Sequence, residues 1–180
     1  MTNFVKPFRY VMQIALSVTF MLGIGNCLAA EGQQGELPQV IIETSEGAIE
    51  VTLRPDIAPE TVENFITYAK NGFYEGTLFH RVIPGFMIQG GDPLSKDTDP
   101  RNDGKGGGTG IESEYSDVPQ VRGIVSLANR GTPNSGGSQF FIMHGDMGLP
   151  KNYTIFGLVV QGMDVVDTLG NLPVTAGPSG

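Results

Sequence analysis

The sequence predicts a mainly β protein, built as an antiparallel barrel or sandwich with few helices. Three observations predict this class. Short runs of β-branched and aromatic residues recur along the chain, turn-forming residues separate them, and no β-α-β alternation is present. Glycine is also frequent, at 26 of 180 residues, which favours turns and loops over long helices.

The N-terminal segment has the pattern of a targeting signal. Lys6 and Arg9 precede an apolar run over residues 10–24, and the small residues Ala29 and Ala30 follow. A positive end, a short apolar stretch and small residues are typical of a secretory signal peptide. The apolar run is shorter than the roughly 20 residues that span a bilayer, yet an uncleaved anchor stays an alternative.

This pattern divides the chain into three parts. We expect residues 1–30 to be a signal peptide or N-terminal anchor, residues 31–37 a linker, and residues 38–180 the folded domain. Acylation of Cys27 in a lipoprotein is a further alternative, although Asn26 stands where such sites carry a small residue. The expected location is therefore periplasmic or extracellular, with membrane attachment only if the N-terminal segment is retained.

The domain opens with a predicted hairpin and a predicted helix. Residues 40–44 and 49–53 are strand-like and flank a turn signal. Pro59 suits the first helical turn, the apolar residues that follow recur at helical spacing, and Gly72 suits the end of that helix. The remaining predictions are strands at 77–83, 86–89, 124–128, 139–143 and 155–160, a long loop at 92–110, and a short helix at 163–169.

Charge and composition exclude several classes of function. The formal charge is −8 for the chain and −10 after residue 30, so repulsion of phosphate argues against binding nucleic acid. Cys27 is the only cysteine, and His80 and His144 have no partner at metal-ligand spacing, so no metal is expected. The glycine-rich stretch 104–110 lacks the ending of a phosphate-binding P-loop and predicts a turn-rich loop.

Three segments carry a family resemblance. Residues 79–92 (FHRVIPGFMIQGGD), residues 126–129 (SLAN) and residues 137–142 (GSQFFI) resemble, in order and separation, the signature segments of the cyclophilins. The resemblance implies a closed, eight-stranded antiparallel barrel capped by two helices, with the active groove on its outer face. It also implies a monomeric peptidyl-prolyl cis-trans isomerase that needs no cofactor and acts on proline-containing polypeptides.

The chemistry of that reaction explains which side chains are wanted. Rotation about an X-Pro bond breaks amide resonance, against a barrier of about 18–20 kcal/mol, without any exchange of bonds to the substrate. An enzyme must therefore bind the twisted amide best, with a dry pocket for the proline ring and a donor for the prolyl nitrogen. By resemblance Arg81 is the catalytic donor, because its guanidinium is permanently charged and rich in N–H groups. The resemblance assigns substrate binding to Phe86, Met87, Gln89, Ala128, Asn129, Arg130, Gln139, Phe141, Leu149 and Tyr153.

Some of these positions could also be structural. Strand alternation alone places Phe86 and Met87 on opposite faces, so one of them could belong to the core. Without the family resemblance, Asn129 would be interpreted as a turn residue.

Three departures from the family pattern motivate an alternative function. Gly148 stands where well-known members have tryptophan, and Tyr153 where they have histidine. Residues 173–180 show no strand pattern, although the family closes its barrel there with a last strand. The alternative is a chaperone module that binds proline-containing segments with little turnover.

Overall fold

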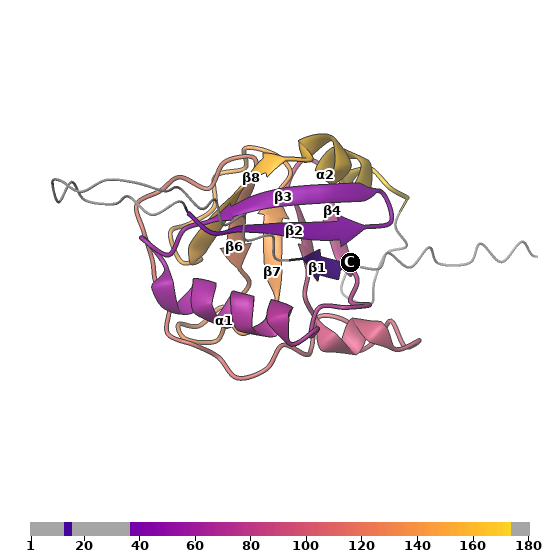
Figure 1. Cartoon of the computed structure of the whole chain (residues 1–180), viewed down its shortest axis with the longest axis horizontal. Coiled ribbons are helices and arrows are strands. Elements are labelled where there is room, and N and C mark those ends of the chain that lie inside the picture. Colours follow the sequence, from indigo (N-terminus) through magenta and orange to yellow (C-terminus); the bar gives the residue numbers. More distant parts are fainter. Residues whose placement is uncertain (1–12, 16–36, 174–180) are drawn as a thin grey trace, which may run out of the picture.

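The computed structural model describes residues 13–15 and 37–173, and Figure 1 shows their arrangement. The described elements are β1 (Gln13–Ala15), β2 (Gln39–Thr44), β3 (Gly47–Leu53), α1 (Pro59–Lys70), β4 (Arg81–Ile83), β5 (Met87–Gly90), the 3-10 helix η1 (Pro93–Lys96), β6 (Ile124–Leu127), β7 (Phe140–Met143), β8 (Ile155–Gln161) and α2 (Met163–Gly170).

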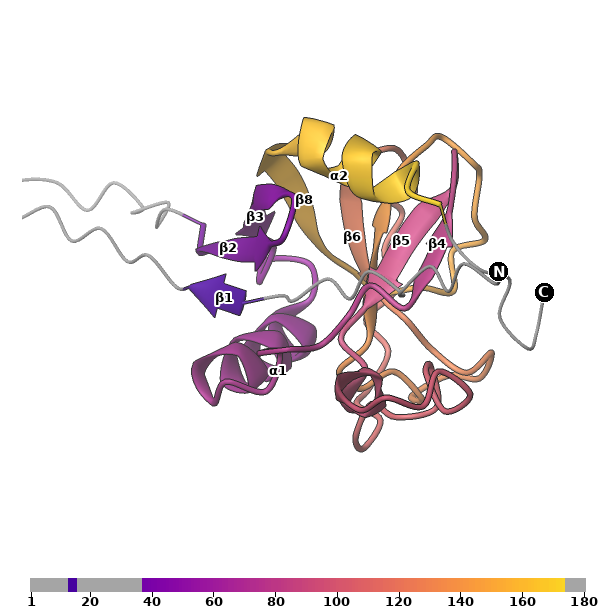
Figure 2. The ribbon, with the colours of Figure 1, turned by 90° about the vertical axis from the view of Figure 1, so that its right-hand side faces the viewer.

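The strands form one curled antiparallel sheet. Its order is β1-β2-β3-β8-β6-β7-β5-β4, so the predicted hairpin lies toward one edge and the strands of the signature segments toward the other. The helices α1 and α2 lie at opposite ends of this curl (Figures 1 and 2). The mainly β class with two α-helices is confirmed.

Closure of the sheet into a barrel is not confirmed. In the described ranges β1 and β4 are the two edges and do not pair with one another, so the sheet is an open, curled half-barrel. Residues 173–180, which show no strand pattern where the family has its last strand, lie outside the described residues except for Pro173. The outer edge of β2 pairs instead with β1, within the expected signal segment. Among the described residues, no helix is both long and apolar enough to cross a bilayer.

The helix α1 forms where its sequence pattern predicts it. Pro59 occupies the first turn, where its missing N–H costs no hydrogen bond. Val62 and Phe65 are buried on the face toward the sheet. The helix ends at Lys70, Asn71 is its C-cap, and Gly72 follows with a φ of +68°, a left-handed conformation that glycine adopts without strain.

The sheet carries a separate apolar cluster on each face. Along β7, Phe140 and Ile142 join the inner core between the sheet and the helices, where Phe65, Tyr74 and Phe156 also pack. Alternate residues of the same strand, Phe141 and Met143, join a smaller cluster on the outer face. The alternation of side chains along a strand thus builds a second apolar surface outside the barrel core.

One predicted strand is much shorter than expected. The prediction covered residues 77–83, but only Arg81–Ile83 forms β4. Phe79 is buried in the inner core, and the amide of Leu78 donates to the hydroxyl of Ser95 at 2.9 Å. The amide of Leu78 is therefore paired with a side chain, and not with the backbone of another strand as the predicted strand would require.

Candidate active site

An apolar hollow opens on the outer face of the sheet. It has a volume of about 390 Å³ and is open to solvent. Its residues come from β4, β5, β7, the turn between β4 and β5, and the loops after β6 and β7. They comprise nine of the eleven residues assigned by resemblance: Arg81, Phe86, Met87, Gln89, Ala128, Asn129, Phe141, Leu149 and Tyr153.

The apolar wall is the exposed end of the outer cluster. Met87 and Phe141 are buried within it, while Phe86 and Leu149 pack against it and remain partly exposed. The ring of Tyr153 meets Phe141 edge to face, with centroids 5.3 Å apart. Phe86 and Met87 both reach the hollow because Phe86 lies in the turn before β5, where strand alternation does not apply.

Arg81 lines the hollow and forms no ion pair with any carboxylate of the described residues. Its Nη1 donates to Oε1 of Gln89 at 3.4 Å, across the register pair that joins β4 to β5. Nη1 also lies 4.0 Å from the sulfur of Met87. Because Gln89 is neutral, this contact orients the guanidinium without cancelling its charge. Its remaining N–H groups are available to a ligand in the hollow.

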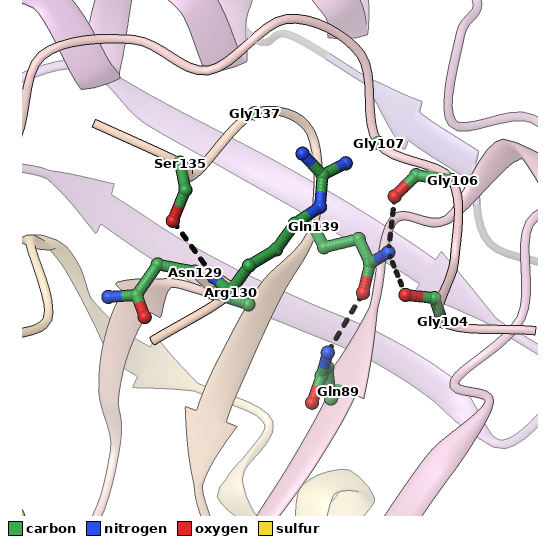
Figure 3. A pocket seen from close by; sticks show the side chains of 10 residues that line it. Gln89, Gly104, Gly106, Gly107, Asn129, Arg130, Ser135, Gly137 and Gln139 are labelled. Atoms are coloured by element: carbon green, nitrogen blue, oxygen red, sulfur yellow. Dashed lines mark hydrogen bonds between the residues drawn. The ribbon is translucent and has the colours of Figure 1, made fainter. Parts of the chain in front are cut away.

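Gln139 orients the amide of Gln89 in turn. Its Oε1 accepts a hydrogen bond from Nε2 of Gln89 at 2.9 Å. Its own Nε2 donates to the carbonyls of Gly104 and Gly106, at 3.0 and 2.7 Å. Gln139 is 8% exposed and lines a second hollow beside the first. Figure 3 shows this chain of amides between the glycine-rich loop and the groove.

The segment after β6 presents free backbone along the groove. The side chain of Asn129 is occupied, since its Nδ2 donates to the carbonyl of Asn152 and its Oδ1 accepts from the amide of Gly131. Within the described part of the chain, no hydrogen bond is formed by its backbone N–H or carbonyl. The side chain of Asn129 is thus held by its own loop and by Asn152, and the residue lines the hollow with its backbone groups unpaired among the described residues.

The sequence did not indicate a role for the glycine-rich loop. Residues 104–110 read as a turn-rich loop, whereas Gly104 and Gly106 supply the acceptors that hold Gln139. The loop lies against the segment before β7, where the amide of Ser138 donates to the carbonyl of Gly107 at 2.7 Å. A β-carbon on Gly137 would overlap that carbonyl. The many glycines in this loop could have indicated that it packs closely against another segment, because close approach of two backbones requires residues without side chains.

Neither histidine lines the hollow; His144 is buried, whereas His80 is only partly buried. Nδ1 of His144 accepts from the amide of Gly85 at 3.0 Å and so supports the turn before Phe86. Burial lowers the pKa of His80, although the nearby Asp92 acts in the opposite direction. Within the described ranges, no three His, Cys, Asp or Glu side chains gather as a metal site requires.

Comparison with known proteins places the chain in a family. Residues 39–179 match the family described as "Cyclophilin type peptidyl-prolyl cis-trans isomerase/CLD". The chain is 43% identical over 142 residues to peptidyl-prolyl cis-trans isomerase-like 3 of Gallus gallus, over 75% of this chain and 83% of that protein. The protein therefore belongs to the cyclophilin-type peptidyl-prolyl cis-trans isomerases, and the predicted enzyme class is confirmed.

Solved structures agree with this assignment. A cyclophilin-type isomerase of Cryptosporidium parvum, crystallised in the presence of the dipeptide Ala-Pro, is 35% identical with a TM-score of 0.69, over 76% of this chain and 87% of that one. A cyclophilin from Hirschia baltica is 27% identical with a TM-score of 0.63, over 78% of this chain and 69% of that one.

Proposed function

We propose that the apolar hollow binds the proline ring of an X-Pro segment and that Arg81 catalyses rotation of its peptide bond. The observation that carries this proposal is the guanidinium of Arg81, which is held by a neutral amide at the mouth of an apolar hollow. As the bond twists, the prolyl nitrogen regains its lone pair. A charged donor beside that nitrogen stabilises the twisted amide more than either planar form.

The other site residues divide the remaining tasks. The apolar wall excludes water from the proline ring, and this strengthens the interaction between Arg81 and the prolyl nitrogen. It is formed by Phe86, Met87, Phe141, Leu149 and Tyr153. Gln89 and Gln139 hold the guanidinium in place. The free backbone of Asn129 is available to pair with an extended substrate backbone. The cyclophilin from Cryptosporidium parvum was crystallised with a proline-containing dipeptide, which supports the same class of substrate here.

The first experiment is a protease-coupled isomerisation assay on an X-Pro peptide, with the full chain and its Arg81→Ala variant. Losing one preorganised donor should lower kcat/KM by about two orders of magnitude. Circular dichroism should remain unchanged, because Arg81 is exposed and forms no ion pair with a described carboxylate. Arg81→Lys is the matched variant, which keeps the charge and loses the planar fork. Equal turnover by Arg81→Ala and the parent chain would refute this role.

A second outcome of the same assay identifies the alternative function. Gly148 precedes Leu149, which lines the hollow, and a β-carbon on Gly148 would meet no atom within 4 Å, so the tryptophan that well-known members carry there has no counterpart in this chain. A folded chain that binds X-Pro peptides without accelerating them would be a binding module, and the isomerase proposal would fail.

We further propose that the substrates are exported proteins, whose folding this monomeric enzyme assists outside the cytoplasm. Uncatalysed X-Pro isomerisation takes tens to hundreds of seconds, which is slow enough to limit folding. Support comes from the pattern of residues 1–30. N-terminal sequencing of the protein from cell fractions tests it. A start near Glu31 in the exported fraction is expected, whereas an intact N-terminus found only in the cytoplasm would contradict it.

A further inference from the structure

A second hollow adjoins the first along the groove. It has a volume of about 360 Å³, is open to solvent, and shares Gln89, Ala128 and Asn129 with the apolar hollow. Much of its remaining wall is glycine: Gly104, Gly106, Gly107 and Gly137. Nε2 of Gln139 links the segment before β7 to the glycine-rich loop by donating to the carbonyls of Gly104 and Gly106. Because the glycines carry no side chains, the second hollow has the space to receive a side chain of a ligand.

The spacing of side chains in an extended peptide connects the two hollows. Side chains alternate between faces, so a residue two positions from the proline points to the same surface as the proline ring. The separation is about 6.6 Å, at about 3.3 Å per residue. Because the two hollows are adjacent and share three lining residues, a substrate with its proline in the first would place such a side chain at the second.

Arg130 supplies the charge of the second hollow. It is exposed, and it is the only charged residue among those that line this hollow. Its backbone is held by the hydroxyl of Ser135, which accepts from the amide of Arg130 at 2.9 Å. Figure 3 shows its side chain extended across the hollow toward Gly107, between the two loops.

Arg130 differs from most of the described arginines in forming no ion pair. Of the five arginines in the described ranges, Arg54, Arg101 and Arg122 each form an ion pair with an aspartate. The two that form none with a described carboxylate are Arg81 and Arg130, and each lines one of the two hollows. No acidic residue lines either hollow. The charged residues that line the groove are thus both cationic, on a chain with a net charge of −8. The nearby carboxylate of Asp92 lies behind the glycine wall, where it accepts from the amides of Gly104 and Gly106.

We propose that Arg130 is a specificity-determining residue that selects X-Pro segments carrying aspartate or glutamate two residues from the proline. The proposal rests on the proposed function, because it takes the first hollow as the proline site. A carboxylate there pairs with the guanidinium, while a lysine is repelled by the same charge. The net negative charge of the chain would otherwise disfavour acidic segments, so a local cation is needed to reverse that tendency.

The test compares peptides that differ only two residues before or two residues after the proline, with Glu, Gln or Lys at that position. For the full chain, kcat/KM with Glu should exceed that with Lys by about threefold to tenfold at one of the two positions, as for a partly exposed ion pair. Arg130→Gln should bring this ratio close to one, and Arg130→Glu should invert it. The ratio should also fall as salt is added, since the pair is open to solvent.

A matched control carries the same change of charge elsewhere. Lys70 ends α1 and lines neither hollow, so Lys70→Glu should leave the Glu-to-Lys ratio unchanged. If the Gln peptide is turned over but the ratio does not respond to Arg130→Glu at either position, the selectivity proposal is overturned and the isomerase function stands. If no peptide is turned over, the isomerase function fails. In that case, dissociation constants of the same peptides are measured by fluorescence anisotropy. Tighter binding of the Glu peptide than of the Lys peptide, lost in Arg130→Gln, would support the selectivity, and equal binding would overturn it.

Discussion

His80 shows how a single residue of the signature segment can be structural and still titrate. It precedes Arg81 in the sequence, but it lines neither hollow. Both its ring nitrogens are buried and form no well-aligned hydrogen bond with a described residue, although the backbone of Leu78 is close enough to raise the pKa of the ring. Burial penalises its charged form, and this lowers its pKa against the opposing influence of Asp92.

The lowered pKa predicts how stability depends on pH. Below the ordinary histidine pKa of 6.5, the unfolded chain binds a proton that the folded chain does not, so the free energy of unfolding should fall as pH decreases. Urea unfolding at about pH 7.5 and about pH 5.5 measures this loss. His80→Gln should lose less stability over the same interval. Equal losses in the two proteins would show that His80 does not titrate in this way.

At the scale of elements, α1 depends on a group from a distant loop. Its N-cap residue, Ala58, provides no side-chain cap. The carboxylate of Glu114 takes that place and accepts from the amides of Glu60 and Thr61, at 3.0 and 2.8 Å. It also accepts from the hydroxyl of Thr61 at 2.7 Å. A negative charge at a helix N-terminus is favourable as well, because it meets the positive end of the helix dipole.

Loss of this cap should destabilise the domain. We expect Glu114→Ala to lower the free energy of unfolding by about 1–2 kcal/mol, the usual cost of a lost N-cap. Glu112→Ala is the control, because Glu112 lies two residues away, is exposed and forms no ion pair with a described residue. Denaturant unfolding compares the two. If both substitutions lowered the free energy of unfolding to a similar extent, the loss of a negative charge, and not the loss of the cap, would be the cause.

At the scale of the whole molecule, the curled sheet separates stability from binding. Its inner face packs against both helices, whereas its outer cluster ends at the apolar hollow. Phe140 and Phe141 are consecutive in β7 and point to these two faces. Phe140 contacts the rings of Phe65, Tyr74 and Phe79, and it is fully buried.

Truncating these two neighbours should therefore have different consequences. Phe140→Ala should lower the free energy of unfolding by about 3–5 kcal/mol, as expected for a large cavity in a core. Phe141→Ala should affect peptide turnover more strongly, with a raised KM, because it removes a wall of the hollow. Thermal unfolding and the isomerisation assay measure the two effects. The division between faces would be wrong if Phe140→Ala proved the milder of the two for stability.

Much of the fold could be predicted because its signals are local. Pro59, the apolar spacing after it and Gly72 predict α1 almost residue by residue, since capping and periodicity act within a few turns. Most strands were predicted within a few residues for the same reason. The strand at 77–83 was overestimated because the partner of its amide, Ser95, lies 17 residues away in sequence. The prediction of a closed barrel is not confirmed; it came from the family resemblance and not from a pattern in the residues themselves.

The sequence by itself determined the family and the identity of the side chains in the groove, because both depend on residue types at fixed spacing. Only the tertiary structure decided how they cooperate. The chain from Gly104 through Gln139 and Gln89 to Arg81 joins segments 50 and 35 residues apart. The cap on α1 joins residues more than 50 positions apart. Spacing along the chain cannot specify such pairs, because sheet register and loop packing determine which distant polar groups meet.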